Sequence, residues 1–119
     1  MKYYGVELEG FLKNSIIDVA SSPRNLITDE SGKTFTNTGA SGAITFNLPS
    51  AAKGLMFTFA KVVGQNVVIS AAAGDYIADS LIAGTITNSD DSDTSAILTL
   101  KCVSDSKWIA YGSGSWSTA

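Results

Sequence analysis

The side chains that most enzymes use for acid–base and nucleophilic chemistry are scarce in this sequence, which contains no histidine and one cysteine, Cys102. The lack of histidine excludes Ser-His and Cys-His nucleophile pairs and removes the commonest general base and metal ligand. A single cysteine likewise excludes zinc sites built from Cys and His. Because Cys102 lies in the apolar stretch 96–103, we expect a buried, unreactive thiol. The sequence therefore argues against an enzyme and predicts no catalytic residue, metal or cofactor.

Three short motifs have both a functional and a structural interpretation, and the structural one is favoured each time. Gly32-Lys33-Thr34 matches the end of a phosphate-binding loop, but Ile27 stands where that loop needs its first glycine, so we expect a turn before a strand. The acidic run at 90–93 lacks the glycine and the bidentate glutamate of a calcium loop, so we expect a solvated turn. Glu7 and Glu9 would share a strand face, as a glycosidase pair might, but neighbouring carboxylates on one exposed strand are usually only solvated.

The composition describes one domain that is poor in charge. Its 119 residues suffice for a single hydrophobic core. Charged residues make up only 16% of the chain, against about a quarter in most soluble proteins, and a surface with few charges is easily desolvated when subunits meet. The net charge of -3 and the pI near 4.6 argue against a nucleic-acid partner. No apolar run approaches the roughly 18 residues of a membrane span, and residues 1–10 lack the apolar core of a secretion signal.

The strongest structural signal is the alternation of apolar and polar residues that β-strands require. Ile44, Phe46 and Leu48 share one face of a strand that Pro49 ends. The segments 42–48, 54–63 and 94–103 alternate in this way, and we expect two further strands at 67–71, which is rich in β-branched residues, and at 107–111. We expect two β-hairpins, one from 54–63 and 67–71 and one from 94–103 and 107–111, because a short polar turn joins each pair.

Short strands separated by turn signals roughly every 8–12 residues predict an all-β fold, a small antiparallel β-sandwich or barrel with an extended N-terminal arm. Only 50–53 and 76–83 could hold a helical turn, and no repeat of about 20–50 residues is visible. The turn-forming segment before residue 24 divides the chain into 1–23, an N-terminal arm or extra strands, and 24–119, the β-module. The expected core consists of Ile44, Phe46, Leu48, Leu55, Phe57, Phe59, Val68, Leu98 and Leu100.

Aromatic residues near the two ends of the chain are the remaining candidates for binding. Trp108 is expected in the core or at the rim of the final hairpin, and Tyr111 lies on the same strand. Tyr3, Tyr4 and Trp116 have little core of their own to fill, so we expect them to contact a partner.

The central part of the chain reads SGKTFTNTGA at 31–40, ITFNLPSA at 44–51 and GLMFTF at 54–59, followed by VVI at 67–69, GDYI at 74–77 and KWIAYG at 107–112. These segments, together with Trp116, resemble a β-module found in bacteriophage and prophage virion proteins. The resemblance covers Leu26 to Trp116 and involves strand and turn residues rather than a catalytic signature. It implies a virion role without indicating where on the particle, because such modules occur in tail fibres, spikes and head-associated proteins.

Among virion roles we expect a capsid decoration or cement protein that stabilises the head as a homotrimer at local three-fold positions, since the chain begins at its own Met1 and contains little besides this module. Its partners would be its own copies and the major capsid protein, with neither nucleic acid nor a membrane, in a virion assembled in the bacterial cytoplasm. The expected partner-binding residues are Tyr3, Tyr4, Phe11, Leu12, Ile16, Ile17 and Trp116. The alternative is a tail fibre or tail-associated receptor-binding module whose exposed aromatics engage a host glycan or surface protein.

Overall fold

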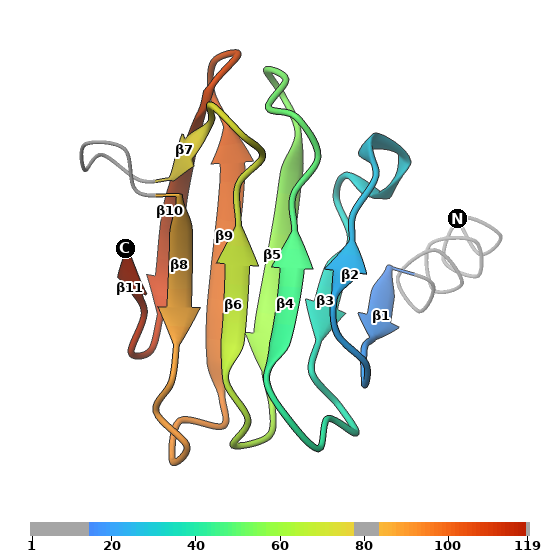
Figure 1. Ribbon diagram of the computed structural model, residues 1–119, viewed down its shortest axis with the longest axis vertical. Coiled ribbons are helices and arrows are strands. Elements are labelled where there is room, and N and C mark those ends of the chain that lie inside the picture. Colours follow the sequence, from blue (N-terminus) through green and yellow to red (C-terminus); the bar gives the residue numbers. More distant parts are fainter. Residues whose placement is uncertain (1–14, 78–83, 119) are drawn as a thin grey trace, which may run out of the picture.

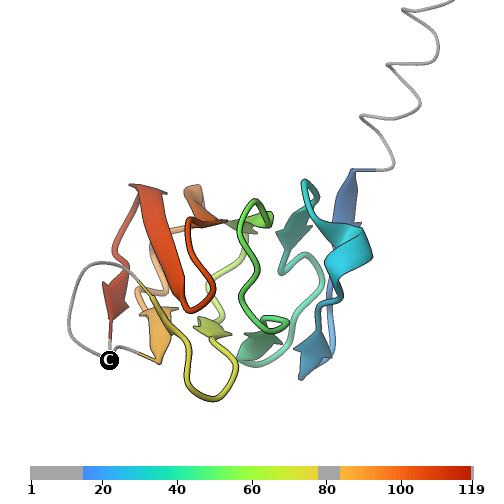
Figure 2. The same ribbon diagram turned by 90° about the horizontal axis from the view of Figure 1, so that it is seen from above.

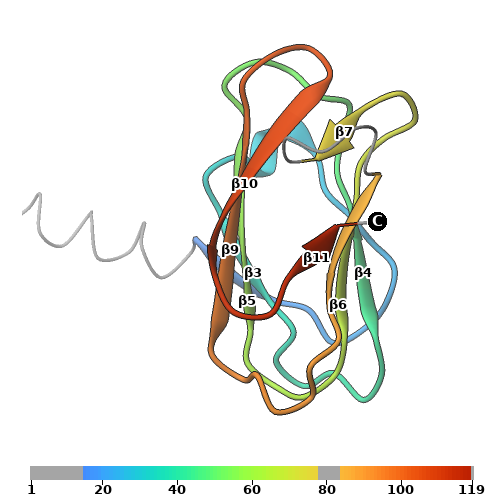
Figure 3. The same ribbon diagram turned by 90° about the vertical axis from the view of Figure 1, so that its left-hand side faces the viewer.

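The chain folds into two β-sheets packed face to face, which confirms the all-β class. The computed structural model describes residues 15–77 and 84–118. Their elements are β1 (Ile16–Asp18), β2 (Arg24–Asn25), the 3-10 helix η1 (Thr28–Glu30), β3 (Thr34–Thr36), β4 (Ile44–Asn47), β5 (Met56–Lys61), β6 (Val67–Ser70), β7 (Tyr76–Ile77), β8 (Thr85–Asn88), β9 (Ala96–Cys102), β10 (Lys107–Ser113) and β11 (Ser117–Thr118). Figure 1 shows the strands, and Figures 2 and 3 show the two layers edge-on. In this described part, no helix is long and apolar enough to cross a membrane.

Both sheets contain parallel as well as antiparallel pairs, so the expected antiparallel arrangement holds for only part of each sheet. The larger one, here called sheet A, has the order β1-β3-β5-β9-β10-β7, and the smaller one, sheet B, has the order β11-β8-β6-β4-β2. From β1 to β6 the chain crosses from one sheet to the other after every strand, and β1, β3 and β5 lie parallel in sheet A while β2, β4 and β6 lie parallel in sheet B. The first half of the module is therefore a stack of three coils, a repeat that the sequence does not reveal.

The hairpin expected between 54–63 and 67–71 is wrong. β5 pairs with β3 and β9, whereas β6 pairs with β4 and β8, so the turn between them carries the chain from one sheet to the other. The buried amide of Asn37 supports this turn: its Nδ2 donates to the carbonyls of Val63 and Gln65, and its Oδ1 accepts from the N–H groups of Val62 and Val63. A side chain from another coil thus satisfies backbone groups that a hairpin would pair across its own strands.

The second half of the module closes the stack with antiparallel strands. β9 runs antiparallel to β5, β8 runs antiparallel to β6, and β11 returns to β8. The hairpin expected between 94–103 and 107–111 is confirmed as β9 and β10, which pair from Trp108 opposite Cys102 to Ser113 opposite Ile97.

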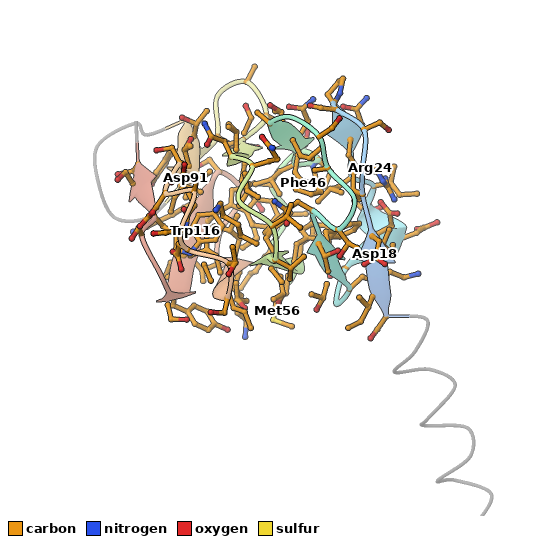
Figure 4. All side chains as sticks on the ribbon, turned by 90° about the horizontal axis from the view of Figure 1, so that it is seen from below. Asp18, Arg24, Phe46, Met56, Asp91 and Trp116 are labelled. Atoms are coloured by element: carbon orange, nitrogen blue, oxygen red, sulfur yellow. The ribbon has the colours of Figure 1, made fainter. Side chains whose placement is uncertain are left out.

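The core lies between the two sheets and is rich in aromatic rings. Phe35, Phe46, Phe57, Phe59 and Trp108 form a continuous cluster with neighbouring ring centroids 5.1–6.3 Å apart. Trp108 is fully buried, in agreement with its expected place in the core. Figure 4 shows Phe46 between the layers.

Seven of the nine residues expected in the core are buried: Ile44, Phe46, Leu48, Phe57, Phe59, Leu98 and Leu100. Leu55 is half-buried against the cluster. The prediction that Val68 lies in the core is wrong, because Val67 and Ile69 occupy the inward positions of β6 and Val68 lies on the outer face.

The two segments that could have held a helical turn, 50–53 and 76–83, form none where the structure describes them. Residues 50–53 form no helix, Tyr76–Ile77 is strand β7, and the one helical turn in the described residues is η1. Gly39, in the connection between β3 and β4, has a positive φ of 82°, which glycine adopts without strain. Within residues 1–23, Ile16–Asp18 is strand β1 of sheet A, and 21–23 belong to the connection from β1 to β2.

Candidate interaction surface

The outer face of sheet A carries a regular array of side chains on its three longest strands. Because alternate residues of a strand point to the same side, the register of β5, β9 and β10 places nine side chains on this face in three cross-strand rows. We call this array the sheet A grid; its rows are Met56, Lys101 and Ile109, then Thr58, Thr99 and Tyr111, then Ala60, Ile97 and Ser113. Figure 4 shows Met56 on the outside of the molecule, on the side away from Phe46.

The sheet A grid combines exposed apolar side chains with very little charge. Tyr111 is 54% exposed, Ile97 49% and Ile109 41%, although large apolar residues of a sheet usually face the core. Lys101 is the one charged residue in the grid. Adjacent apolar side chains at this exposure are typical of surfaces that bind another macromolecule.

The middle row of the grid continues across sheet A from β10 to β1. Thr58 lies beside Thr34, and Thr34 lies beside Ile16, which is 54% exposed. The hydroxyls of Thr58 and Thr99 are 3.0 Å apart and form a hydrogen bond. The row therefore has three threonines at its centre and a strongly exposed apolar residue, Ile16 or Tyr111, at each end.

The outer face of sheet B is different, because it carries small polar side chains and the half-buried Val68 instead of exposed large apolar side chains. Its cross-strand rows are Asn25, Asn47, Ser70 and Thr85, then Thr45, Val68, Thr87 and Ser117. Asn47 Nδ2 donates to Asn25 Oδ1 at 2.8 Å, a link between parallel coils. None of these eight residues is charged, so this face serves as a matched comparison for sheet A.

The residues expected to bind a partner differ in where the structure places them. Tyr3, Tyr4, Phe11 and Leu12 lie outside the described residues. Ile16 is exposed on the outer face of β1, whereas Ile17 points inward and packs against the core cluster. Trp116 is half-buried against the same cluster, and its Nε1 donates to the Ser113 carbonyl at 2.9 Å. Of these residues in the described part, Ile16 is the one that offers a freely accessible apolar side chain.

Two of the exposed apolar residues, Ile97 and Ile109, were missed. The alternation of 94–103 predicts that Ala96, Leu98 and Leu100 point inward, and this is confirmed. The opposite phase of the same segment holds Ile97 where a solvated strand would hold a polar residue. An apolar residue at an outward position of the alternating strand was therefore the sequence signal that could have indicated an exposed binding surface.

A buried lysine organises the acidic turn between β8 and β9. Lys61 is fully buried, and its Nζ donates to the carbonyls of Asp90 at 2.6 Å and Asp93 at 3.0 Å. The buried amide of Asn88 donates to Asp93 Oδ2 at 2.8 Å and accepts from the Asp90 N–H. The described residues contain no group of three or more His, Cys, Asp or Glu placed to hold a metal ion. The turn is thus a structural element, in which the Lys61 ammonium group donates hydrogen bonds to the carbonyl oxygens of Asp90 and Asp93.

Hydrogen bonds in this turn favour the ionised carboxylates. The side chain and backbone of Ser92 hydrogen-bond to Asp90 and lower the pKa of that carboxyl. The pKa of Asp93 is lowered chiefly by the Asn88 amide and the Ser115 N–H. Both carboxylates are therefore acceptors that hold the turn in place.

A second ionised carboxylate network fixes the chain after β2. Arg24 donates to both carboxylate oxygens of Glu30, with Nη2 to Oε2 at 2.6 Å, and lies 5.4 Å from the centre of the Phe35 ring. Partial burial acts to raise the pKa of Glu30, but the Arg24 guanidinium and the Ile27 N–H outweigh it, so that the pKa lies below its ordinary value.

The remaining reactive motifs have structural roles where they are described. Burial raises the pKa of the Cys102 thiol, which donates to the Ser104 carbonyl, so the thiol is protonated and unreactive at neutral pH. Gly32 has a φ of 91° and leads into β3, as expected for a turn. Glu7 and Glu9 lie outside the described residues.

Neither a known protein-family model nor a curated protein matches this sequence at a significant level. The distinguishing property of the sheet A grid is its exposed large apolar side chains, because the outer face of sheet B carries mostly small polar ones.

Proposed function

We propose that this chain is a structural protein of a bacteriophage virion, a decoration or cement protein that binds the capsid as a homotrimer and stabilises the head. The observation that carries the proposal is the sheet A grid, in which exposed apolar side chains lie beside a single ammonium group. Covering such a face gains about 25 cal/mol per Å² of apolar surface and desolvates little charge. A protein held between the subunits of a large particle needs a face of this kind.

The virion assignment itself comes from the sequence, through the resemblance of residues 26–116 to modules of phage particles. The chain acts as a binding scaffold in this proposal, with other copies of itself and the major capsid protein as partners. The sheet A grid faces the capsid, and residues 1–14 add a second contact through Tyr3, Tyr4, Phe11 and Leu12.

Binding to phage heads that lack decoration proteins tests the proposal. We expect Ile109→Lys to weaken co-sedimentation with such heads at least tenfold, because it places a second ammonium group beside Lys101 in the contact. The matched control is Thr87→Lys on the outer face of sheet B, which should bind as wild type does. Removal of residues 1–14 should also abolish binding while the melting temperature of the remaining domain is retained. Equal binding by the Ile109 and Thr87 variants would exclude the grid as the contact.

A receptor-binding role on the phage tail is the second candidate, favoured by the position of Tyr111. This exposed ring lies beside Thr99, whose hydroxyl is hydrogen-bonded to that of Thr58 on the next strand, and an aromatic ring with hydroxyls on one side is suited to the apolar face and hydroxyl groups of a sugar. Binding to purified host envelope rather than to bare heads, with loss of binding in Tyr111→Ala, would support this role against the first.

A further inference from the structure

Sheet A ends in two strand edges that no described strand covers along their length. β1 is the first strand in its order. At the other side, β7 pairs only with Lys107 and Trp108, which leaves 109–113 of β10 without a neighbour on that side. Figure 1 shows β1 and β10 on opposite sides of the molecule. Uncovered edges of this kind present backbone groups that can pair with another chain.

The backbone groups on the free side of β1 belong to Ile16 and Asp18. The Ser15 carbonyl accepts from the Thr34 N–H at 2.7 Å, and the Val19 N–H donates to the Thr36 carbonyl at 2.9 Å. Because backbone groups of a strand alternate in direction, those of Ile16 and Asp18 point away from β3. Within the described residues they have no hydrogen-bond partner.

The corresponding groups on β10 belong to Ala110 and Gly112. Val103 N–H donates to the Lys107 carbonyl at 3.1 Å, which makes that position a hydrogen-bonded pair of the antiparallel ladder. Hydrogen-bonded pairs recur at every second position, so Ile109 and Tyr111 bond to β9, and the groups of Ala110 and Gly112 point outward. Each edge of sheet A thus has two residues whose backbone N–H and C=O groups point away from the sheet, with one residue between them.

The two edges match in direction and in side chains. β1 is parallel to β3 and β5, β9 is antiparallel to β5, and β10 is antiparallel to β9, so β1 and β10 run the same way. Ile16 and Tyr111, each 54% exposed, end the same cross-strand row at opposite sides of the sheet. Placing β10 of one copy parallel to β1 of another, with Tyr111 opposite Ile16, brings these two side chains into contact.

We propose that β1 of one copy of this chain pairs in parallel with residues 109–113 of β10 of a second copy, which continues sheet A from one subunit into the next. Ile16 N–H donates to the Ala110 carbonyl of the neighbouring copy, and the Gly112 N–H of that copy donates to the Ile16 carbonyl. The outward backbone groups of both strands are used, and the row of Ile16, three threonines and Tyr111 becomes continuous between subunits.

Side chains near the edges agree with this assignment. At the corresponding edge of sheet B, Arg24 Nη1 donates to the Asn25 carbonyl at 2.9 Å and so protects β2 from pairing. Asp18 gives no such protection to β1, because its carboxylate is held by the Thr36 hydroxyl at 2.6 Å. The β1 edge of sheet A is therefore open to pairing, whereas at the β2 edge of sheet B the Arg24 side chain occupies a backbone carbonyl.

The contact joins two different surfaces, and contacts of this type generate either a closed ring or an open filament. Closure at three copies rests on the proposed homotrimer, whereas the pairing of β1 with β10 does not depend on it or on a virion role.

A disulfide between positions 16 and 111 tests the pairing directly. In the variant with Ile16→Cys and Tyr111→Cys, paired strands would place the two Cα atoms about 5 Å apart, within disulfide range. Within one chain, β3, β5 and β9 lie between these positions, which separates them by four strand spacings of about 4.8 Å and prevents an internal bond. We expect oxidation to give reducible trimers on a denaturing gel. The controls are the two single variants and the pair Ile16→Cys with Thr87→Cys, which should give no ring.

Backbone donation is tested by Ile16→Pro, which removes the outward N–H and keeps an edge-compatible backbone. Light scattering should give a mass near 12.4 kDa for this variant, and about three times that mass for wild type and for Ile16→Ala, which retains the N–H. Failure of the 16 and 111 pair to cross-link in an oligomeric sample, or a monomeric wild type, would overturn the pairing even if binding to phage heads persists. Cross-linked rings of another size would keep the pairing and refute the homotrimer.

Discussion

Truncation of the buried amide of Asn37 should destabilise the fold much more than truncation of an amide on the outer surface. Asn37→Ala removes four hydrogen bonds to the turn between β5 and β6. A net value of about 1 kcal/mol for each bond gives an upper figure of about 4 kcal/mol. Val62 and Gln65 of the turn are exposed, so water replaces part of this loss, and we expect a decrease of about 3 kcal/mol in the free energy of unfolding.

The assay is urea unfolding followed by tryptophan fluorescence, because Trp108 lies in the core. A loss of about 3 kcal/mol corresponds to a fall in the melting temperature of roughly 10–15 °C for a domain of this size. Asn47→Ala is the matched control. Among the described residues its side-chain amide donates to Asn25 alone, on the outer face of sheet B, and we expect a loss below about 1 kcal/mol.

Equal effects of the two alanine substitutions would refute the argument that the buried amide stabilises the turn between the sheets. Asn37→Asp gives a second measurement, because it keeps an acceptor for the Val62 and Val63 N–H groups and turns another oxygen toward the carbonyls of Val63 and Gln65. Repulsion and burial raise the pKa of this new carboxyl in the folded state. The deficit relative to wild type should therefore be largest at neutral pH and shrink as the pH falls toward about 4.

Four further outcomes are expected. Phe57→Ala should cost about 3–5 kcal/mol because the ring is fully buried, and a variant that melts within a few degrees of wild type would contradict its place in the core. Gly112→Ala should be destabilising because a Cβ there would collide with a carbonyl of the adjacent strand, whereas Gly42→Ala, with open space around it, should be neutral in thermal melts. The lowered pKa values of Glu30 and the two aspartates of the acidic turn mean that their stabilising effect is complete above the ordinary carboxyl pKa of about 4 and is lost as the pH falls through the lowered values; the melting temperature should drop below about pH 4, and less so in Glu30→Gln. Native Cys102 should resist a thiol reagent at pH 8 and react after unfolding; rapid native labelling would contradict its burial.

The local pattern of the sequence was sufficient for most strands and for most of the core. Alternation placed Ile44, Phe46 and Leu48 inward, and it also oriented β5 and β9 correctly. The reason is that a strand with one buried face must repeat every second residue, a requirement that neighbouring residues alone reveal. The same rule was ambiguous at 67–69, where three apolar residues follow one another and pairing of Val67 with Ile44 decides which face is buried.

What the sequence by itself determined was therefore the class of the fold, the inward face of most strands and the shortage of catalytic side chains. Apart from the hairpin of β9 and β10, only the tertiary structure decided which strands pair, because a turn between two strands has the same kinds of residue whether the strands stay in one sheet or separate into two. For β5 and β6, the side chain of Asn37, far from the turn in sequence, satisfies the backbone groups of the turn that leads from one sheet to the other. The candidate surface has the same origin: Ile16 and Tyr111 lie near opposite ends of the chain, and only the register of five strands places them in one row.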